Sequence, residues 1–344
     1  MLYEIDPFRD ARWIKFVQSH PHSSIFHSRG WLQALQLTYG YQPTVFTTNS
    51  SAEQLTNGIL CCYVKSWLTG SRLVSLPFSD HCQPLVTNTD EFSSLIAGLQ
   101  AIISERDCRY FELRPVIDDS QVYSATKLSK DSSYYFHRLD LRPTPEEIFD
   151  GFHKSCVKRK IRKAENHLEY REGISEAIVA DFYKLLIATR LRHRMLPQPL
   201  GWFRNLASTL GKDIKMRIAY LERKPIASII TIAHGTSIVY KYGCSDASFH
   251  SFGGMPFLFW RAIQDAKASG AEYMDLGRTD ENNLGLTRFK QHLGATCFRL
   301  TYYRYPPQEH AIQSWGTSAL SPILRFLPQS LCRAAGEILY RHVG

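Results

Sequence analysis

The sequence has 344 residues, of which 44% are hydrophobic and 21% are charged. This composition is typical of a globular protein with enough chain for about two domains, and the 19 Phe, 18 Tyr and 6 Trp exclude a disordered chain. The formal net charge of +9 indicates an anionic partner: phosphate, nucleic acid or an acidic membrane surface.

The eight cysteines contain no C-x-x-C pair and are typical of reduced core cysteines. No Cys/His spacing suggests zinc, so the sequence predicts no metal site. The N-terminus, MLYEIDPFRDARW, lacks the apolar segment of a signal peptide, and no apolar run approaches the ~20 residues that a membrane span needs. We therefore expect a cytoplasmic protein.

Residues 1–143 predict a mixed α/β domain. A helical face that contains Trp31 and Leu35 ends at Gly40. Alternating and β-branched runs, separated by turn residues, predict further elements: strands at 44–48, 58–64 and 72–76, a helix at 90–105, and strands at 110–113 and near 136–141.

Residues 144–306 predict a second domain with the same order of elements, which favours a structural duplication. A helix beginning near Thr144 is expected to run into HKSCVKRKIRKAENH. A helix over 176–194 and strands at 215–220, 226–233 and 237–242 follow. In the last of these strands Ile238, Tyr240 and Tyr242 alternate onto one face.

The stretch from Gly253 to Ala295 has the clearest pattern. Pro256 follows two glycines, as a first-turn proline should, and Gly270 is placed to end the helix. A strand at 273–276, a polar turn at 277–283 and a second short helix that carries Arg288, Phe289 and Lys290 follow. This succession is how α/β enzymes place functional groups at the end of a sheet.

Four groups of residues are candidates for chemistry. Between Lys154 and Lys163 there are six Lys/Arg and no acid, which favours either contact with a polyanion or a solvated face. Gly253 and Gly254 precede a helix, where free N–H groups can hold phosphate, or they form a plain turn. Asp80 and His81, between prolines, are either site residues or a turn and its cap.

The fourth group is a cluster of charges around the strand at 273–276. A lysine there can stabilise an oxyanion, and a carboxylate can take a proton from an attacking amine. The alternative is a solvated loop with a surface lysine. Motifs of serine hydrolases, P-loop proteins and Rossmann folds are absent from the sequence. The cluster consists of Asp275, Arg278, Asp280, Arg288 and Lys290.

These segments resemble the FemAB-like branch of the GNAT-type acyltransferases. The matching pieces are KRKIRKAE, KPIASIITIAHGTSIVYKYGCSD and FGGMPFLFWRAIQDAKASGAEYMDLGRTDENNLGLTRFKQHLGA, with HSRGWLQALQLTYGYQP and LPFSDHCQPLV in the first half. The resemblance covers most of residues 25–305. It implies two tandem GNAT-like domains facing a cleft, each a mixed, largely antiparallel sheet with helices on both faces.

The resemblance also implies site residues and partners. The family's catalytic lysine falls on Lys290, and its cleft residues come from around Tyr242, Arg278 and Asp280. Phosphates of the acceptor, a peptidoglycan or polysaccharide precursor, would meet basic side chains at Arg159, Arg162 and Arg288. No cofactor is expected to be tightly bound, and the acyl donor is either acyl-CoA or an aminoacyl-tRNA. We expect no DNA partner.

Two departures from the family pattern affect the donor. Residues 165–215 leave no room for the coiled-coil arm that some members carry. The segment His250-Ser-Phe-Gly-Gly-Met does not match the Gln/Arg-x-x-Gly-x-Gly/Ala loop of acetyl-CoA enzymes.

Residues 307–344 form a tail in which Pro322 and Pro328 divide short amphipathic helices. The tail either docks on the body or, through residues 314–344, contacts the inner face of a membrane. The sequence thus predicts an acyl- or aminoacyltransferase acting on an amine or hydroxyl of a cell-envelope precursor. The alternative is a non-catalytic GNAT-like binding module at an anionic membrane or glycan surface.

Overall fold

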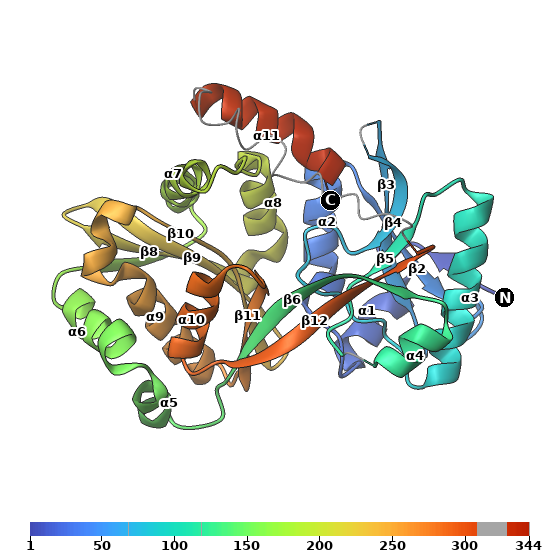
Figure 1. Ribbon diagram of the computed structural model, residues 1–344, viewed down its shortest axis with the longest axis horizontal. Coiled ribbons are helices and arrows are strands. Elements are labelled where there is room, and N and C mark those ends of the chain that lie inside the picture. The colour runs from blue at the N-terminus through green and yellow to red at the C-terminus, as the bar shows by residue number, and fades with distance from the viewer. Residues whose placement is uncertain (68, 118, 308–328, 344) are drawn as a thin grey trace. The chain divides into compact units, whose positions relative to one another are not determined.

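The computed structural model describes the whole chain except residues 68, 118, 308–328 and 344 (Figure 1). The chain divides into two compact units. Unit 1 comprises Met1–Tyr134 with the described residues of Arg299–Ser314 and Ile338–Gly344. Unit 2 comprises Tyr135–Phe298 with the described residues of Trp315–Glu337. The long strands β6 (Ser129–Asp140) and β12 (Thr296–Tyr305) contribute residues to both units.

Unit 1 is built on strands in the order β1-β2-β3-β4-β5-β12. The pairs from β1 to β4 are antiparallel, β4 and β5 are parallel, and the end of β12 pairs antiparallel with β5. The strands are β1 (Tyr3–Ile5), β2 (Gln42–Thr47), β3 (Ile59–Ser66), β4 (Gly70–Ser75) and β5 (Phe111–Leu113).

The helices of unit 1 bury one apolar face each. Leu95 and Leu99 of α3 lie in one core cluster with residues of β2, β3 and β4, as the helical spacing predicts. Gly40 ends α2 in the left-handed conformation, with φ 73°, which glycine adopts without strain. The helical segments are α1 (Ala11–Ser19), η1 (Ile25–His27), α2 (Arg29–Tyr39), α3 (Thr89–Glu105) and α4 (Ser120–Ala125).

Unit 2 has strands in the order β6-β11-β10-β9-β8-β7. The pairs from β7 to β10 are antiparallel, whereas β10 and β11 are parallel. Strand β9 is buried along most of its length, as its continuous apolar run predicts. The strands are β7 (Glu169–Gly173), β8 (Ile214–Leu221), β9 (Lys224–His234), β10 (Ser237–Ser245) and β11 (Tyr273–Asp280).

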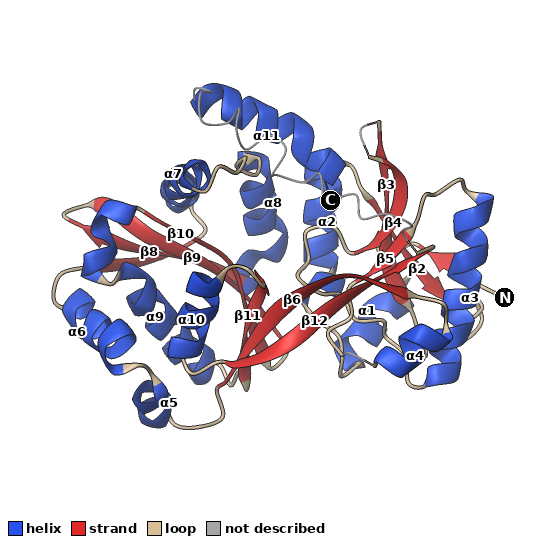
Figure 2. Cartoon of the chain, viewed as in Figure 1, coloured by secondary structure: helices blue, strands red, loops and turns tan. Residues whose placement is uncertain are grey.

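Helices cover both faces of the unit 2 sheet (Figure 2). Helix α7 packs against β8, β9 and β10, and α9 contacts the same strands together with α6. The fold class expected from the sequence, a mixed and largely antiparallel sheet with helices on both faces, is confirmed. The helical segments are α5 (Pro145–Gly151), η2 (Lys154–Lys158), α6 (Arg159–Glu165), α7 (Glu176–Arg192), α8 (Leu200–Leu210), η3 (Gly211–Asp213), η4 (Ala247–Phe252), α9 (Gly254–Ala268) and α10 (Leu284–His292).

Two predicted boundaries in unit 2 are wrong. The helix that begins after Thr144 has the expected capping box with Glu147, but it ends at Gly151 instead of running into the basic segment. His153 then caps a new helical start. Strand β11 continues to Asp280, through part of the predicted turn at 277–283.

The predicted domain boundary at 143 stays a prediction. The chain passes from one compact unit to the other within β6 and again within β12. Part of the predicted tail, residues 308–328, lies outside the described residues. Helix α11 (Gln329–Val343) follows it. The C-terminal end of α11 belongs to unit 1 and is hydrogen-bonded to its β2 and β3 region. Tyr41 Oη donates to the carbonyl oxygen of Arg341 (2.9 Å), and Trp67 Nε1 donates to His342 Nε2 (3.1 Å).

Candidate functional site

Strands β10 and β11 pair only at their beginnings. Ser237–Val239 of β10 pairs with Tyr273–Asp275 of β11, whereas β10 continues to pair with β9 up to Ser245. The register of β10 shifts between Tyr240 and Tyr242. Such a β-bulge bends its strand, so the bulge lies where β10 parts from β11.

A pocket of about 370 Å³ lies beyond this parting, within the size range of small-molecule sites. Its walls come from β9, β10, η4, α9, α10 and the start of the helical segment formed by η2 and α6. The lining includes Lys160, Arg288, His250 and His292 and no carboxylate. The pocket therefore suits an anionic ligand.

The first turn of α9 forms one wall. Its N-cap, Gly253, has φ +80°, and a Cβ there would lie 2.5 Å from the carbonyl oxygen of Lys160. Glycine is thus required both by the backbone conformation and by the close approach of α6. No side chain caps this turn and no acid lies in it. The positive end of the helix dipole is therefore not neutralised by the protein's own carboxylates.

The two pocket histidines are held neutral near pH 7. Burial, followed by the charges of Arg192 and Lys160, lowers the pKa of His250, whose Nε2 lies 2.9 Å from Ser245 Oγ. Partial burial, then His153 and Arg288, lower the pKa of His292. The positive charge of the pocket consequently comes from Lys160 and Arg288.

Residues 152–291 match the family model of the acetyltransferase (GNAT) domain. This range includes nearly all of the pocket lining. The structure of FemX matches with a TM-score of 0.70 and 13% identity, over 88% of this chain and 97% of that one. The matched part of the chain is thus similar to a GNAT acetyltransferase domain, and the chain shares the fold of the FemX structure.

Two further solved structures share the fold. L-PGS from Bacillus licheniformis matches with a TM-score of 0.56 and 14% identity, over 95% of this chain and 97% of that one. A tandem GNAT protein from the clavulanic acid biosynthesis pathway matches with a TM-score of 0.57 and 11% identity, over 90% and 100%. No curated protein matches the sequence of this acyltransferase. The tandem GNAT-like architecture expected from the sequence is confirmed.

Lys290, the predicted catalytic lysine, is buried, with 2% of its surface exposed. Its Nζ donates to the carbonyl oxygens of Gly277 (2.9 Å) and Arg278 (3.2 Å) and to Thr279 Oγ1 (2.7 Å). Three acceptors match the three hydrogens of an ammonium group. Lys290 therefore fastens α10 to β11, and to bind an oxyanion it would have to exchange one of these bonds. Its catalytic role stays a prediction.

The two predicted acids do not line the pocket. Asp275 is buried within β11 and accepts a hydrogen bond from the Gly277 N–H (2.6 Å). Asp280 is exposed at the end of the same strand. Arg278 is half-buried in β11. Of the predicted charged cluster, the pocket includes Arg288.

The predicted phosphate-binding arginines lie on α6. Arg159 and Arg162 are both exposed, and the guanidinium of Arg162 lies 5.8 Å from the ring centre of Phe149. From the same basic run it is Lys160 that lines the pocket. Of the predicted glycines, Gly254 lines it, while Gly253 caps the helix beside it.

The bulge separates two tyrosines that regular alternation predicts on one face. Tyr240 lines the pocket and packs on Phe259. Tyr242 instead accepts a hydrogen bond from Trp202 Nε1 (2.8 Å) and packs on Phe203 of α8. One inserted residue reverses the faces of the side chains that follow it, so the alternation predicted at 237–242 is wrong at Tyr242.

Asp80 and His81 belong to unit 1. The carbonyl oxygen of Asp80 accepts a hydrogen bond from Tyr302 Oη (2.6 Å). His81 is buried, with its ring edge-on to Phe26 at 5.1 Å. Their predicted roles in binding substrate stay predictions.

Sequence reasoning missed four polar residues that line the pocket. All lie in segments already singled out, but the basic run was treated as charge alone, and no local pattern connects α10 to η2. The residues are Cys156, Lys160, His250 and His292.

Proposed function

We propose that this acyltransferase binds the phosphate groups of its acyl donor in the pocket between β10, α9 and α10. The acyl group then passes to an amine or hydroxyl of a cell-envelope peptidoglycan or polysaccharide precursor. The observation that carries the proposal is the uncapped, acid-free first turn of α9, which opens onto a pocket lined by Lys160 and Arg288. Such a turn favours a phosphate through its N–H groups and its dipole.

Both candidate donors, acyl-CoA and aminoacyl-tRNA, carry phosphates: in acyl-CoA the pantetheine arm separates them from the thioester, and in aminoacyl-tRNA they link the nucleotides that lead to the acylated end. The solved structure of the tandem GNAT protein is described as the form without AcCoA. A further similar structure, the C-terminal domain of a putative lysylphosphatidylglycerol synthetase from Agrobacterium fabrum, matches with a TM-score of 0.53 and 12% identity, over 86% of this chain and 91% of that one. These names support acyl or aminoacyl transfer in envelope biosynthesis.

In the reaction, the acceptor nitrogen or oxygen forms a bond to the acyl carbonyl carbon, and the donor's thioester or ester bond breaks. The proton lost by the acceptor is transferred to the leaving thiol or hydroxyl. We propose Asp280 or Asp275 as the group that relays this proton and Lys290 as the residue that fixes the end of β11 beside the reacting atoms. Asp280 is the more accessible of the two acids.

The phosphorylated part of the acceptor is proposed to meet Arg159, Arg162 and Arg278. Arg159 and Arg162 support this by their exposure on α6. Asp80 and His81 are proposed as further substrate-binding residues within unit 1. The buried Tyr242 would act by supporting β10.

We also propose peripheral contact with a membrane. Among the described residues, no helix is long and apolar enough to span a bilayer. In unit 1, Trp67 and Ile338 are 79% and 60% exposed, and exposed aromatic and aliphatic side chains favour a membrane surface. Flotation of the full chain with anionic liposomes tests the contact. A chain that stays at the bottom of the gradient would contradict the proposed membrane contact.

The donor is identified by measuring binding of acetyl-CoA and of aminoacyl-tRNA to the purified full chain, followed by turnover with envelope precursors. Lys160→Ala and Arg288→Ala should each weaken donor binding about tenfold, because each removes one charge-assisted contact. Arg204→Ala is the matched control, since Arg204 is an exposed arginine paired with Glu176 and lies outside the pocket lining.

If Lys160→Ala and Arg288→Ala both bound the donor with wild-type affinity, the pocket would not be the donor-binding site. Donor binding without turnover for any acceptor would instead support the non-catalytic module.

A further inference from the structure

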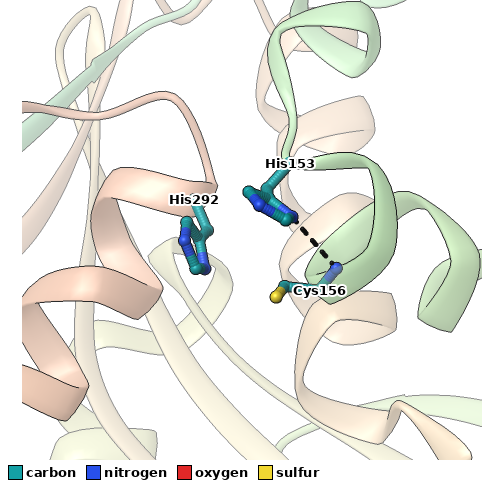
Figure 3. A group of neighbouring side chains, drawn as sticks. All are labelled: His153, Cys156 and His292. Atoms are coloured by element: carbon teal, nitrogen blue, oxygen red, sulfur yellow. Dashed lines mark hydrogen bonds between the residues drawn. The ribbon is translucent and has the colours of Figure 1, made fainter.

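Three side chains that can bind a metal gather at the edge of the pocket (Figure 3). They are His153, Cys156 and His292, and their ligand-capable atoms all lie within 4.8 Å of one another. Cys156 and His292 also line the pocket. None of the three takes part in the proposed donor-binding or acyl-transfer roles, so this inference does not depend on the proposed function.

Backbone hydrogen bonds fix where these residues lie. His153 is the N-cap of η2, and its Nδ1 accepts a hydrogen bond from the Cys156 N–H at 3.2 Å (Figure 3). The His153 N–H donates to the carbonyl oxygen of His292 at 2.9 Å, which ties the end of α10 to the start of η2. The two imidazole rings consequently lie 4.3 Å apart between centres.

The donor set is chemically specific. One thiolate and two imidazoles are borderline-soft ligands that favour Zn²⁺ over Mg²⁺ or Ca²⁺. With Zn–S bonds of ~2.3 Å and Zn–N bonds of ~2.0–2.1 Å, the ligand atoms of a tetrahedral site lie roughly 3.3–3.7 Å apart. Small side-chain rotations bring the observed spacing of 4.8 Å or less into this range, and His153 and Cys156 are exposed and have room to make them.

We propose that His153, Cys156 and His292 bind one Zn²⁺ ion, with the fourth coordination position open to the pocket. Three protein ligands and one open position are the arrangement of catalytic rather than structural zinc sites. An oxygen atom of a molecule in the pocket can occupy that fourth position, so the ion provides a Lewis acid at the pocket edge.

Coordination changes the cap of η2. Nδ1 of His153 uses its lone pair to accept the Cys156 N–H. If Nδ1 binds the metal, this lone pair is taken, and if Nε2 binds it, the ring proton moves to Nδ1. In both cases the cap bond is lost, so zinc should speed hydrogen exchange at the Cys156 amide.

The test titrates Zn²⁺, and then Co²⁺ as a spectroscopic substitute, into the full chain after dialysis against a chelator. We expect one ion per chain, and a thiolate-to-cobalt charge-transfer band. Cys156→Ser should abolish the band, and both Cys156→Ser and His292→Ala should weaken binding by at least about tenfold. Cys297→Ser is the matched control, because Cys297 is a partly exposed cysteine of the same unit outside the cluster.

His153→Asn distinguishes the metal-binding role of His153 from its helix-capping role, because asparagine is an equally good N-cap but supplies no imidazole. This variant should fold with wild-type stability and lose zinc affinity by at least about tenfold. A second readout is alkylation of the eight cysteines followed by mass spectrometry, in which zinc should protect Cys156 and leave Cys297 unprotected. Binding without the thiolate band, wild-type affinity in Cys156→Ser, or equal alkylation of Cys156 with and without zinc would overturn the proposal.

Discussion

The helix that follows the fourth antiparallel strand begins differently in the two units. In unit 1 this helix is α3, whose N-cap Asn88 accepts a hydrogen bond from the Glu91 N–H (2.9 Å), with Asp90 and Glu91 in the first turn. In unit 2 it is α9, whose N-cap Gly253 offers no side chain and whose first turn has no acid. The surroundings are otherwise alike: four antiparallel strands precede each helix, and a strand parallel to the fourth follows it.

The chain before each helix differs as well. In unit 1 the segment between β4 and α3 returns to the sheet through bridges from Cys82 to Arg114 and from Leu85 to Gly58. Unit 2 has no such bridge among its described residues, and its pocket lies at the corresponding place. The same order of elements thus gives one helix start closed to anions and one open to them.

Among the changes that test this comparison, replacement of Lys290 should have the largest effect, which is a loss of stability in unit 2. Lys290→Met removes a buried ammonium group and leaves three acceptors of β11 without their donor. The free energy of unfolding should fall by about 3 kcal/mol, measured by urea denaturation. Lys184→Met, at an exposed position of α7, is the control. If Lys290→Met lost acyl transfer at full stability, Lys290 would be a catalytic residue instead of a clamp.

Acid should weaken unit 2 through His137. Burial, followed by the charge of Lys290, lowers the pKa of His137 from 6.5 to about 4. Between these values the unfolded chain binds a proton that the folded chain does not, so stability falls as the pH drops below 6.5. At pH 5 the loss is about 2 kcal/mol, and His137→Phe should remove that part of the pH dependence.

A buried histidine of unit 1, His27, provides the contrast. His27 Nε2 lies 3.0 Å from the carbonyl oxygen of Gln83, whereas neither ring nitrogen of His137 has a hydrogen-bond partner among the described residues. An unchanged pH dependence in His137→Phe would show that other groups control the acid response.

A smaller effect is expected from giving α9 the acidic start of α3. Met255 lies in the first turn of α9 and lines the pocket, so Met255→Glu places a negative charge beside the proposed phosphate position. Donor affinity should fall roughly tenfold, about 1.4 kcal/mol, in a binding titration. Gln264→Glu, on the same helix but outside the pocket lining, should not change it.

The converse change in unit 1 completes the comparison. Asn88→Ala should cost about 1 kcal/mol of stability through the lost cap and leave donor affinity unchanged. If Asn88→Ala weakened donor binding as much as Met255→Glu, the donor site would not be specific to α9.

Much of the fold could be predicted because its signals are local. Gly40 ends α2 as expected, the box of Thr144 and Glu147 starts α5, and the apolar run of β9 is buried. The helix α8 was missed, and the basic segment was joined to α5, because the break at Phe152 depends on His153 capping the next helix.

The candidate site was harder to predict because its shape arises from pairing between distant strands. The residues from Ile238 to Tyr242 alternate regularly in sequence, and nothing in that pattern marks Lys241 as the inserted residue of a bulge. His292 comes to lie beside Cys156 through a backbone hydrogen bond between α10 and η2, which no spacing rule encodes. The sequence predicts Lys290 as a site residue, but its hydrogen-bond acceptors on β11 follow only from the packing of α10 against that strand.

Lys290 also explains how β11 can leave its neighbour. Beyond Asp275, β11 no longer pairs with β10, and unpaired strand edges tend to close up or recruit another strand. By donating to two successive backbone carbonyls there, the lysine side chain substitutes for a missing strand. The protein itself thus stabilises the separation of β10 and β11, and a molecule that binds beside them need not separate the strands.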